Sequence, residues 1–276
     1  MVRNTKIITL LVTAVAALAV LTGCSEYSRV IKSHDINVKY DYAKKAYDEG
    51  KYVQAYTLLG DLITPLKGSA KGEEALYLLA MSYYNSKDYL NSGVYFKSYY
   101  NRYPKGIYTE DARYYAGYGY YLDSPVSQLD QTETLKAIEE LQGFIDYFPK
   151  SDRVESARNA IFELQDKLTF KELENAQLYY NLGTYMGNNY ESCVIVVDNA
   201  LRQYPYSKYR EELEWLKLKA KYQEARQSVA ERQADRYRDV IDEYYSYVNN
   251  FPDSKNRKEA DTMLREAENK IKKSNF

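Results

Sequence analysis

The sequence predicts an all-α fold, a superhelical solenoid of about five helical hairpins with a C-terminal capping helix. An aromatic residue followed by proline occurs four times, at Tyr103-Pro104, Phe148-Pro149, Tyr204-Pro205 and Phe251-Pro252. The prolines are 45, 56 and 47 residues apart, a period typical of stacked helical repeats. A small residue stands two positions after each proline and an apolar residue eight positions after it: Gly106, Ser151, Ser207 and Ser254, then Ala112, Ala157, Leu213 and Ala260. Because proline ends a helix and serine or glycine suits an N-cap, each turn is expected to end one helix and begin the next.

The first 23 residues have the features of a secretion signal. Arg3 and Lys6 precede an apolar run from Ile7 to Leu21, which ends directly in Thr22-Gly23-Cys24. This ending resembles the lipobox of bacterial lipoproteins, which implies that Cys24 is lipidated and becomes the first residue of a mature chain of residues 24–276. The alternative is a membrane-anchoring helix with a cysteine there by chance, although the apolar run is short for a membrane span.

The remaining chain divides into a tether and two groups of repeats. Residues 24–37 are expected to form the lipidated tether, because they are polar and lack helical periodicity. The only histidine, His34, lies in this tether and is expected to be solvated rather than catalytic or metal-binding. Helical repeats are expected over residues 38–149 and 150–276, the second group including a long helix and the capping helix.

Tight turns ending in tyrosine mark the middle of three hairpins, at Tyr52, Tyr89 and Tyr190. Three positions after each of these tyrosines stands a small residue, in turn Ala55, Ser92 and Cys193. This pattern resembles the tetratricopeptide (TPR) family, in which a small side chain lies where the two helices of a hairpin cross closely. The resemblance implies that Cys193 is a packing residue.

Three segments depart from a regular repeat. Asp123 to Thr132 contains Ser124-Pro125 and is expected to be a surface loop. No Pro or Gly occurs from Lys150 to Leu182, which predicts one long helix from about Asp152 to Met186. The polar stretch Gln223 to Arg236 is expected to be an extended helix end or a loop that projects into solvent. The capping helix is predicted from an apolar stripe among charges: Ala260, Met263, Leu264, Ala267 and Ile271.

Composition argues against several classes of function. The 38 basic and 39 acidic residues nearly balance, so no nucleic-acid partner is suggested. One histidine, one cysteine beyond Cys24 and the lack of a glycine-rich phosphate loop leave no catalytic or metal-binding constellation. We therefore expect an interaction scaffold that is not an enzyme and has no cofactor.

Tyrosine is unusually abundant, with 33 tyrosines against seven phenylalanines and one tryptophan. In a TPR register, the groove-facing positions of the first three hairpins are mostly tyrosine: Tyr40, Lys44 and Tyr47, then Tyr77, Met81 and Tyr84, then Tyr114, Tyr118 and Tyr121. Tyrosine combines a rigid apolar ring with a hydroxyl, which suits the side chains and unpaired backbone of an extended peptide. The hypothesis is a peptide-binding groove; the alternative is that these tyrosines only pack the hairpins together.

The lipobox followed by about five TPR-like hairpins resembles the BamD family, lipoproteins of the outer-membrane β-barrel assembly machine. The most specific part runs from Gly50 to Ala112, and the Phe148-Pro149-Lys150-Ser151 turn with the long helix after it supports the likeness. The resemblance implies a lipid-anchored protein of the outer membrane that faces the periplasm. It also implies binding to the periplasmic domains of BamA through the C-terminal half, association with other lipoproteins of the machine, and receipt of the C-terminal strands of unfolded outer-membrane proteins.

Two other readings stay open. Another periplasmic TPR lipoprotein could serve as an adaptor for cell-division or peptidoglycan enzymes. An enzyme such as a murein hydrolase with a helical domain is disfavoured, because the repeats leave no residues for a catalytic domain. The sequence assigns no residues to contact with BamA.

Overall fold

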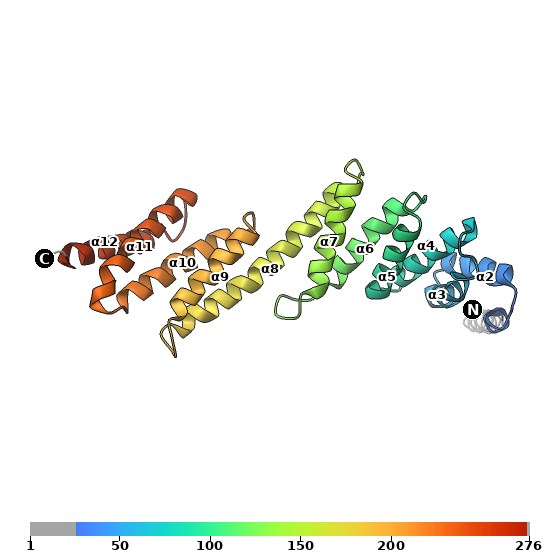
Figure 1. Ribbon diagram of the computed structural model, residues 1–276, viewed down its shortest axis with the longest axis horizontal. Helices are drawn as coiled ribbons and strands as arrows, with labels where there is room; N and C mark the ends of the chain where they lie inside the picture. Colours follow the sequence, from blue (N-terminus) through green and yellow to red (C-terminus); the bar gives the residue numbers. More distant parts are fainter. Residues whose placement is uncertain (1–25, 275–276) are drawn as a thin grey trace, which may run out of the picture. The chain divides into compact units, whose positions relative to one another are not determined.

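The computed structural model describes residues 26–274, and every regular element among them is helical (Figure 1). The helices are α2 (Ile36–Asp48), α3 (Tyr52–Leu62), α4 (Ala70–Asn85), α5 (Tyr89–Arg102), α6 (Thr109–Asp123), α7 (Thr132–Tyr147), α8 (Val154–Leu182), α9 (Asn189–Gln203), α10 (Arg210–Arg226), α11 (Ala230–Asn250) and α12 (Arg257–Ser274). From α2 to α7 and from α9 to α12, each helix packs against the next along the chain. This confirms the predicted all-α fold of helical hairpins.

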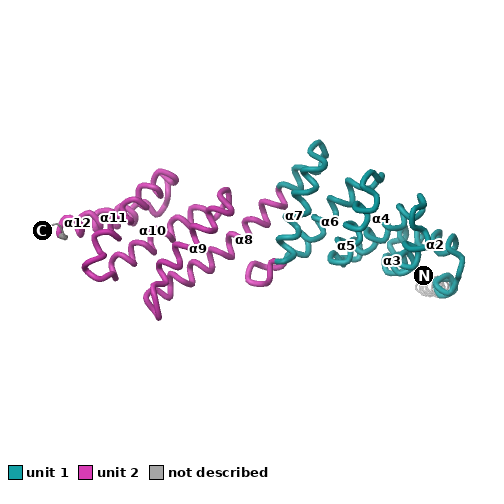
Figure 2. The backbone as a smooth tube through the Cα atoms, viewed as in Figure 1, with its two compact units in different colours: residues 1–124, 132–158 teal, residues 125–131, 159–276 magenta. Residues whose placement is uncertain are grey.

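The chain forms two compact units, which are coloured separately in Figure 2. Unit 1 contains α2 to α7 and the start of α8, up to Arg158, whereas unit 2 contains the loop 125–131, the rest of α8, and α9 to α12. The division therefore falls inside α8, whereas the sequence placed it at the Pro149 turn. The continuous helix that the sequence predicted carries the chain from one unit into the other.

Residues 26–31 are helical, although no helical periodicity was expected in the tether. The ring of Tyr27 stacks on that of Tyr42 with centroids 6.1 Å apart, and Val30 is buried against the core of unit 1. This short segment is ordered by contacts with α2, which its own sequence pattern does not reveal. His34 is exposed just before α2, as expected.

The predicted loop and long helix are both confirmed. Between α6 and α7 the chain has no regular structure, and α8 runs unbroken for 29 residues. The polar stretch 223–236 forms the end of α10, a short turn and the start of α11. The centre of this stretch, residues 229–232, is exposed, as predicted. The prediction is wrong near its start, because Ala225 is fully buried and Gln227 Nε2 donates a hydrogen bond of 2.9 Å to the hydroxyl of Tyr190.

The small residues at the hairpin crossings are fully buried. Ala55, Ser92 and Cys193 each have no exposed surface, as the repeat pattern predicts. The apolar positions eight residues after each proline are buried to the same degree: Ala112, Ala157, Leu213 and Ala260. Burial also raises the pKa of the Cys193 thiol to about 12, so this group is a neutral packing side chain at physiological pH.

The serines after the prolines do not act as N-caps, which corrects the sequence prediction. Ser151, Ser207 and Ser254 each accept a hydrogen bond from the backbone N–H two residues later, and the helix begins three residues after the serine. The same hydroxyls donate to carboxylates on the first helix of the preceding hairpin, namely Glu110 (2.5 Å), Asp166 (2.7 Å) and Glu211 (2.7 Å). At the first turn, where Gly106 replaces serine, Glu73 accepts instead from the N–H of Ile107 at 3.0 Å.

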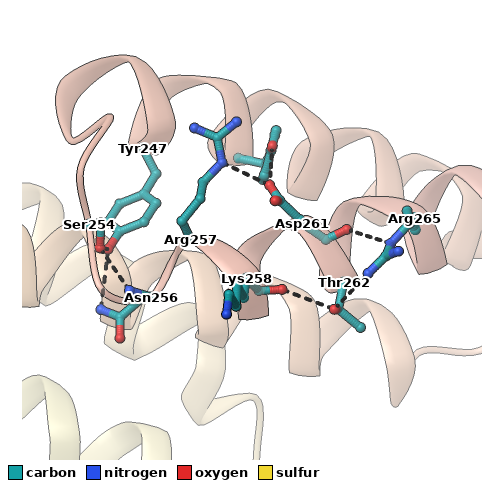
Figure 3. A network of polar contacts seen from close by, with 9 residues as sticks. Tyr247, Ser254, Asn256, Arg257, Lys258, Asp261, Thr262 and Arg265 are labelled. Carbon is teal, nitrogen blue, oxygen red and sulfur yellow. Dashed lines mark hydrogen bonds and ion pairs between the residues drawn. The ribbon is translucent and has the colours of Figure 1, made fainter.

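These carboxylate-to-turn bonds link each repeat to the one before it. Figure 3 shows the last of the turns, where the ring of Tyr247 lies over the turn and its hydroxyl is within 2.6 Å of Ser254 Oγ. Asn256 Nδ2 donates to the same hydroxyl, and Arg257 pairs with Asp261 one turn into α12. The recurring Aro-Pro-x-Ser sequence is therefore explained by a hydrogen-bonded junction between neighbouring repeats as well as by a helix stop.

Candidate peptide-binding face of unit 1

The predicted groove residues lie on the first helices of three hairpins, α2, α4 and α6. The first position of each set, occupied by Tyr40, Tyr77 and Tyr114, sends its hydroxyl to the first helix of the next hairpin. Tyr40 donates to Glu74, Tyr77 donates to Asp111 Oδ2 at 3.2 Å, and the hydroxyl of Tyr114 lies 3.1 Å from Ser156 Oγ. These three tyrosines therefore form hydrogen bonds between neighbouring repeats.

Stacking adds to the packing role of two of these residues. The ring of Tyr77 lies parallel to that of Tyr108, with centroids 4.1 Å apart, and meets Tyr99 edge-on. Tyr114 is only 8% exposed, and its ring packs against that of Phe144 in a T-shaped arrangement. Burial, followed by the neighbouring Asp111 carboxylate, raises the pKa of Tyr77, so its hydroxyl is a neutral donor at physiological pH.

The other six positions are partly exposed: Lys44, Tyr47, Met81, Tyr84, Tyr118 and Tyr121. Tyr118 lies between two predicted residues, with its ring centroid 5.2 Å from Tyr114 and 5.1 Å from Tyr121. The structure thus brings together the three tyrosines of α6. Tyr84 on α4 reaches α6 through Tyr115, and the centres of these two rings are 4.9 Å apart.

Tyr115 and Arg153 belong to this surface, and the sequence analysis missed both. Tyr115 bridges Tyr84 to Tyr114, and the guanidinium of Arg153 lies 5.0 Å and 5.2 Å from the ring centres of Tyr114 and Tyr115. Tyr115 stands three residues before Tyr118, a spacing that places both on one side of a helix, so the sequence contained its signal. No sequence signal indicated that Arg153 lies at this surface, because its position depends on how α8 begins after the Pro149 turn.

The aromatic strip is defined here as Tyr84, Tyr115, Tyr118 and Tyr121, four of the partly exposed tyrosines of α4 and α6. Its rings present apolar faces, and Arg153, which pairs with Asp111, adds a cationic edge. Such a surface can hold aromatic or aliphatic side chains by ring contact. Within residues 26–274 no group of three His, Cys, Asp or Glu side chains is placed to hold a metal ion. Cys24, the predicted lipidation site, lies outside the described residues.

Hairpins that pack in chain order, with small residues at their crossings, define a TPR-like helical-repeat protein. The sequence model of the YfiO family, described as "Outer membrane lipoprotein", matches residues 33–187, which is more than half of the chain. The protein belongs to this family of outer-membrane lipoproteins. In the part of the chain described, no helix combines the length and the apolar character needed to span a membrane.

The comparison with solved structures gave, among its matches, two structures of a Podosopora anserina protein of nearly identical TPR-like repeats, named after kinesin light chain. One of the two is a point variant, and each is 12% identical to this chain with a TM-score of 0.32. They align with 87% and 88% of this chain and with 96% and 99% of their own. A comparison with curated proteins gave no match.

Proposed function

We propose that this protein is a non-catalytic scaffold of the β-barrel assembly machinery, anchored to the outer membrane through a lipid on Cys24 and facing the periplasm. In this proposal unit 1 receives the C-terminal strands of unfolded outer-membrane proteins. The C-terminal half binds the periplasmic domains of BamA, and other lipoproteins of the machinery join the complex. Membership of an outer-membrane lipoprotein family supports the location, and the aromatic strip supports the substrate.

The observation that carries the substrate proposal is the gathering of Tyr84, Tyr115, Tyr118 and Tyr121 on two first helices. A strand of an unfolded barrel protein presents alternating apolar side chains together with unpaired backbone groups. Partly exposed tyrosines offer ring faces to those side chains and hydroxyls to that backbone. A purely aliphatic surface could contact the apolar side chains of such a strand but could not form hydrogen bonds with its backbone.

Site-specific photo-cross-linking in cells tests this proposal. A photoreactive phenylalanine analogue at Met81, which is partly exposed on α4, should form adducts with unfolded outer-membrane proteins. The matched control is the same analogue at Leu90 on α5, which is 48% exposed and lies on a second helix. Equal adducts at both positions, or none at Met81, would contradict binding by the aromatic strip.

Two further experiments test the anchor and the partner. Cys24→Ala should release the protein from the membrane or leave its signal uncleaved, whereas unchanged processing and extraction would argue against lipidation. Purification of the tagged protein with its partners should recover BamA as the main partner. Recovery of a division or peptidoglycan enzyme in its place would favour the adaptor reading.

A further inference from the structure

Unit 2 contains an open groove between its two successive first helices, α8 and α10. Its volume is about 540 Å³, and its lining is largely apolar, with Phe170, Leu173 and Leu178 from α8 and Trp215 from α10. Lys219, one turn after Trp215, also lines it. The lining also includes the carboxylates of Glu174 on α8 and of Glu212, which lies about two helical turns before Lys219 on α10. Lys219 is the one cationic group of the lining.

Lys219 differs from the two lysines beside it on α10. Lys217 pairs with Asp198 at 2.8 Å and with Glu243 at 3.0 Å, and Lys221 pairs with Glu243 at 2.7 Å. Lys219 makes no ion pair with any described residue, and its ammonium lies 5.0 Å and 5.8 Å from the ring centres of Tyr180 and Trp215. The charge is thus held over aromatic rings at the groove without a carboxylate partner.

Burial lowers the pKa of Lys219, because partial loss of solvent disfavours the charged ammonium. Glu259 on α12 acts in the opposite direction but makes no ion pair with it. The nearby Glu174 does not compensate either, because its carboxylate accepts hydrogen bonds from Ser127 at 3.1 Å and from Gln128 at 2.8 Å. A carboxylate from another molecule would supply the missing partner.

Apolar exposure continues beyond the groove along the same side of α8. Leu178 is 58% exposed, and Leu182, one turn further on, is 39% exposed. Tyr185 and Met186 in the following turn are 68% and 90% exposed, and Met186 is one of two non-glycine residues with positive φ among residues 26–274, at 56°. Contiguous apolar surface of this kind is typical of a binding site.

We propose that the groove between α8 and α10 docks a segment of a partner protein that carries apolar side chains next to a carboxylate, which pairs with Lys219. The apolar side chains lie against Phe170, Leu173 and Trp215, and the segment continues toward Leu178 and Leu182. Charge complementarity at Lys219 identifies the occupant, because a wholly apolar segment would leave this ammonium unpaired and a basic group beside it would be repelled. Glu212 lies about two helical turns away on α10 and leaves this position open to a carboxylate. The inference concerns unit 2 and does not depend on the aromatic strip, so the two proposals fail separately.

Selection from a library of random octapeptides by the lipidated protein in lipid nanodiscs tests this inference. Peptides that bind should be enriched in Asp or Glu beside Leu, Phe or Trp. Lys219→Met keeps the aliphatic stem and removes the charge, so it should weaken the selected acidic peptides at least about tenfold. Lys105→Met, at an exposed turn of unit 1, is the matched control and should leave their affinity unchanged.

A second variant covers the case in which Lys219→Met does not fold. Leu178→Asp places a negative charge at an exposed position of the groove wall and should reduce binding of the same peptides by a similar factor. Selection of peptides without acidic residues, or equal binding by the wild type and both variants, would overturn the inference. So would self-association of the wild type that Leu178→Asp abolishes, because the occupant would then be a second copy of this chain.

Discussion

The two units share one kind of junction between repeats but fill their interfaces with different chemistry. In unit 1, tyrosine rings stack across helices, as in the series Tyr56, Tyr83 and Tyr95, whose successive ring centres are 4.3 Å and 5.3 Å apart. In unit 2, Glu243 on α11 joins Lys217 and Lys221 of α10 at a largely buried site. The same proline turn therefore joins successive repeats in both units, whereas the residues that pack between neighbouring helices differ from one unit to the other.

The largest expected effect is in the charged interface of unit 2. The side chain of Glu243 is only 7% exposed, and Glu243→Ala would leave the ammonium of Lys221 without its partner and that of Lys217 with Asp198 alone. We expect a loss of about 3 kcal/mol in the free energy of unfolding, measured by urea denaturation. Glu212→Ala, at an exposed position of α10, is the control and should change stability by less than about 0.5 kcal/mol. Equal effects of the two substitutions would show that the ion pairs do not hold this interface.

Sequence alone predicted the features of these units that depend on local rules. Proline turns marked the helix boundaries, the lack of Pro and Gly predicted α8, and the serine-proline pair predicted the loop after Asp123. Features set by tertiary contact were not predictable. The helix at residues 26–31 depends on burial of Val30, and the serines bond carboxylates roughly forty residues away rather than the next helix.

The positions of the candidate residues were predicted in part, for the same reason. A repeat register placed tyrosines on α4 and α6, and the structure groups Tyr114, Tyr118 and Tyr121. The register could not separate Tyr77, which donates a hydrogen bond to the next repeat, from Tyr84, which reaches α6 through its ring contact with Tyr115. The sequence also did not reveal that Lys217 forms ion pairs whereas Lys219 does not, because the carboxylates that pair with Lys217 come from α9 and α11.

A smaller effect is expected at the helix crossing around Cys193, a feature common to both units. Cys193→Leu should destabilise the protein by about 2 kcal/mol, because the site is fully buried and the larger side chain overpacks it. Cys193→Ala should cost less, since alanine occupies the equivalent position at Ala55. Thermal unfolding of both variants measures the difference. Loss of function in a stable Cys193→Ala protein would point to a chemical role for the thiol.

Removal of one tyrosine hydroxyl in unit 1 should have a smaller effect still. Tyr77→Phe keeps the ring that stacks on Tyr108 but deletes the hydrogen bond to Asp111, so we expect a loss of about 1 kcal/mol. Urea denaturation would show it as a shift in midpoint with an unchanged slope. A change as large as that of Glu243→Ala would remove the energetic contrast between the two interfaces.

The smallest effect is a pH dependence at the last turn of unit 2. Hydrogen bonds from Tyr244 and Arg257 lower the pKa of Asp261 below its ordinary value of 3.8. Because the folded-state pKa is lowered, the carboxylate contributes stability above the unfolded-state pKa and loses it as pH falls through the folded value. Asp261→Asn should therefore unfold with a weaker dependence on pH below about 4 than the wild type. An identical acid profile for both proteins would contradict the role of this contact.

The most direct test of the central claim is the affinity of the whole protein for a labelled peptide with the alternating pattern of a barrel strand and a final phenylalanine. Tyr118→Ala combined with Tyr121→Ala should weaken binding at least about tenfold, while the corresponding double phenylalanine variant should bind more tightly than the alanine variant. Tyr206→Ala, at an 86% exposed position of unit 2, should change nothing. The wild type should also bind less tightly to the same peptide ending in serine. Equal affinity for the two peptides, or an unaffected and stable double alanine variant, would contradict the claim that the aromatic strip receives such strands.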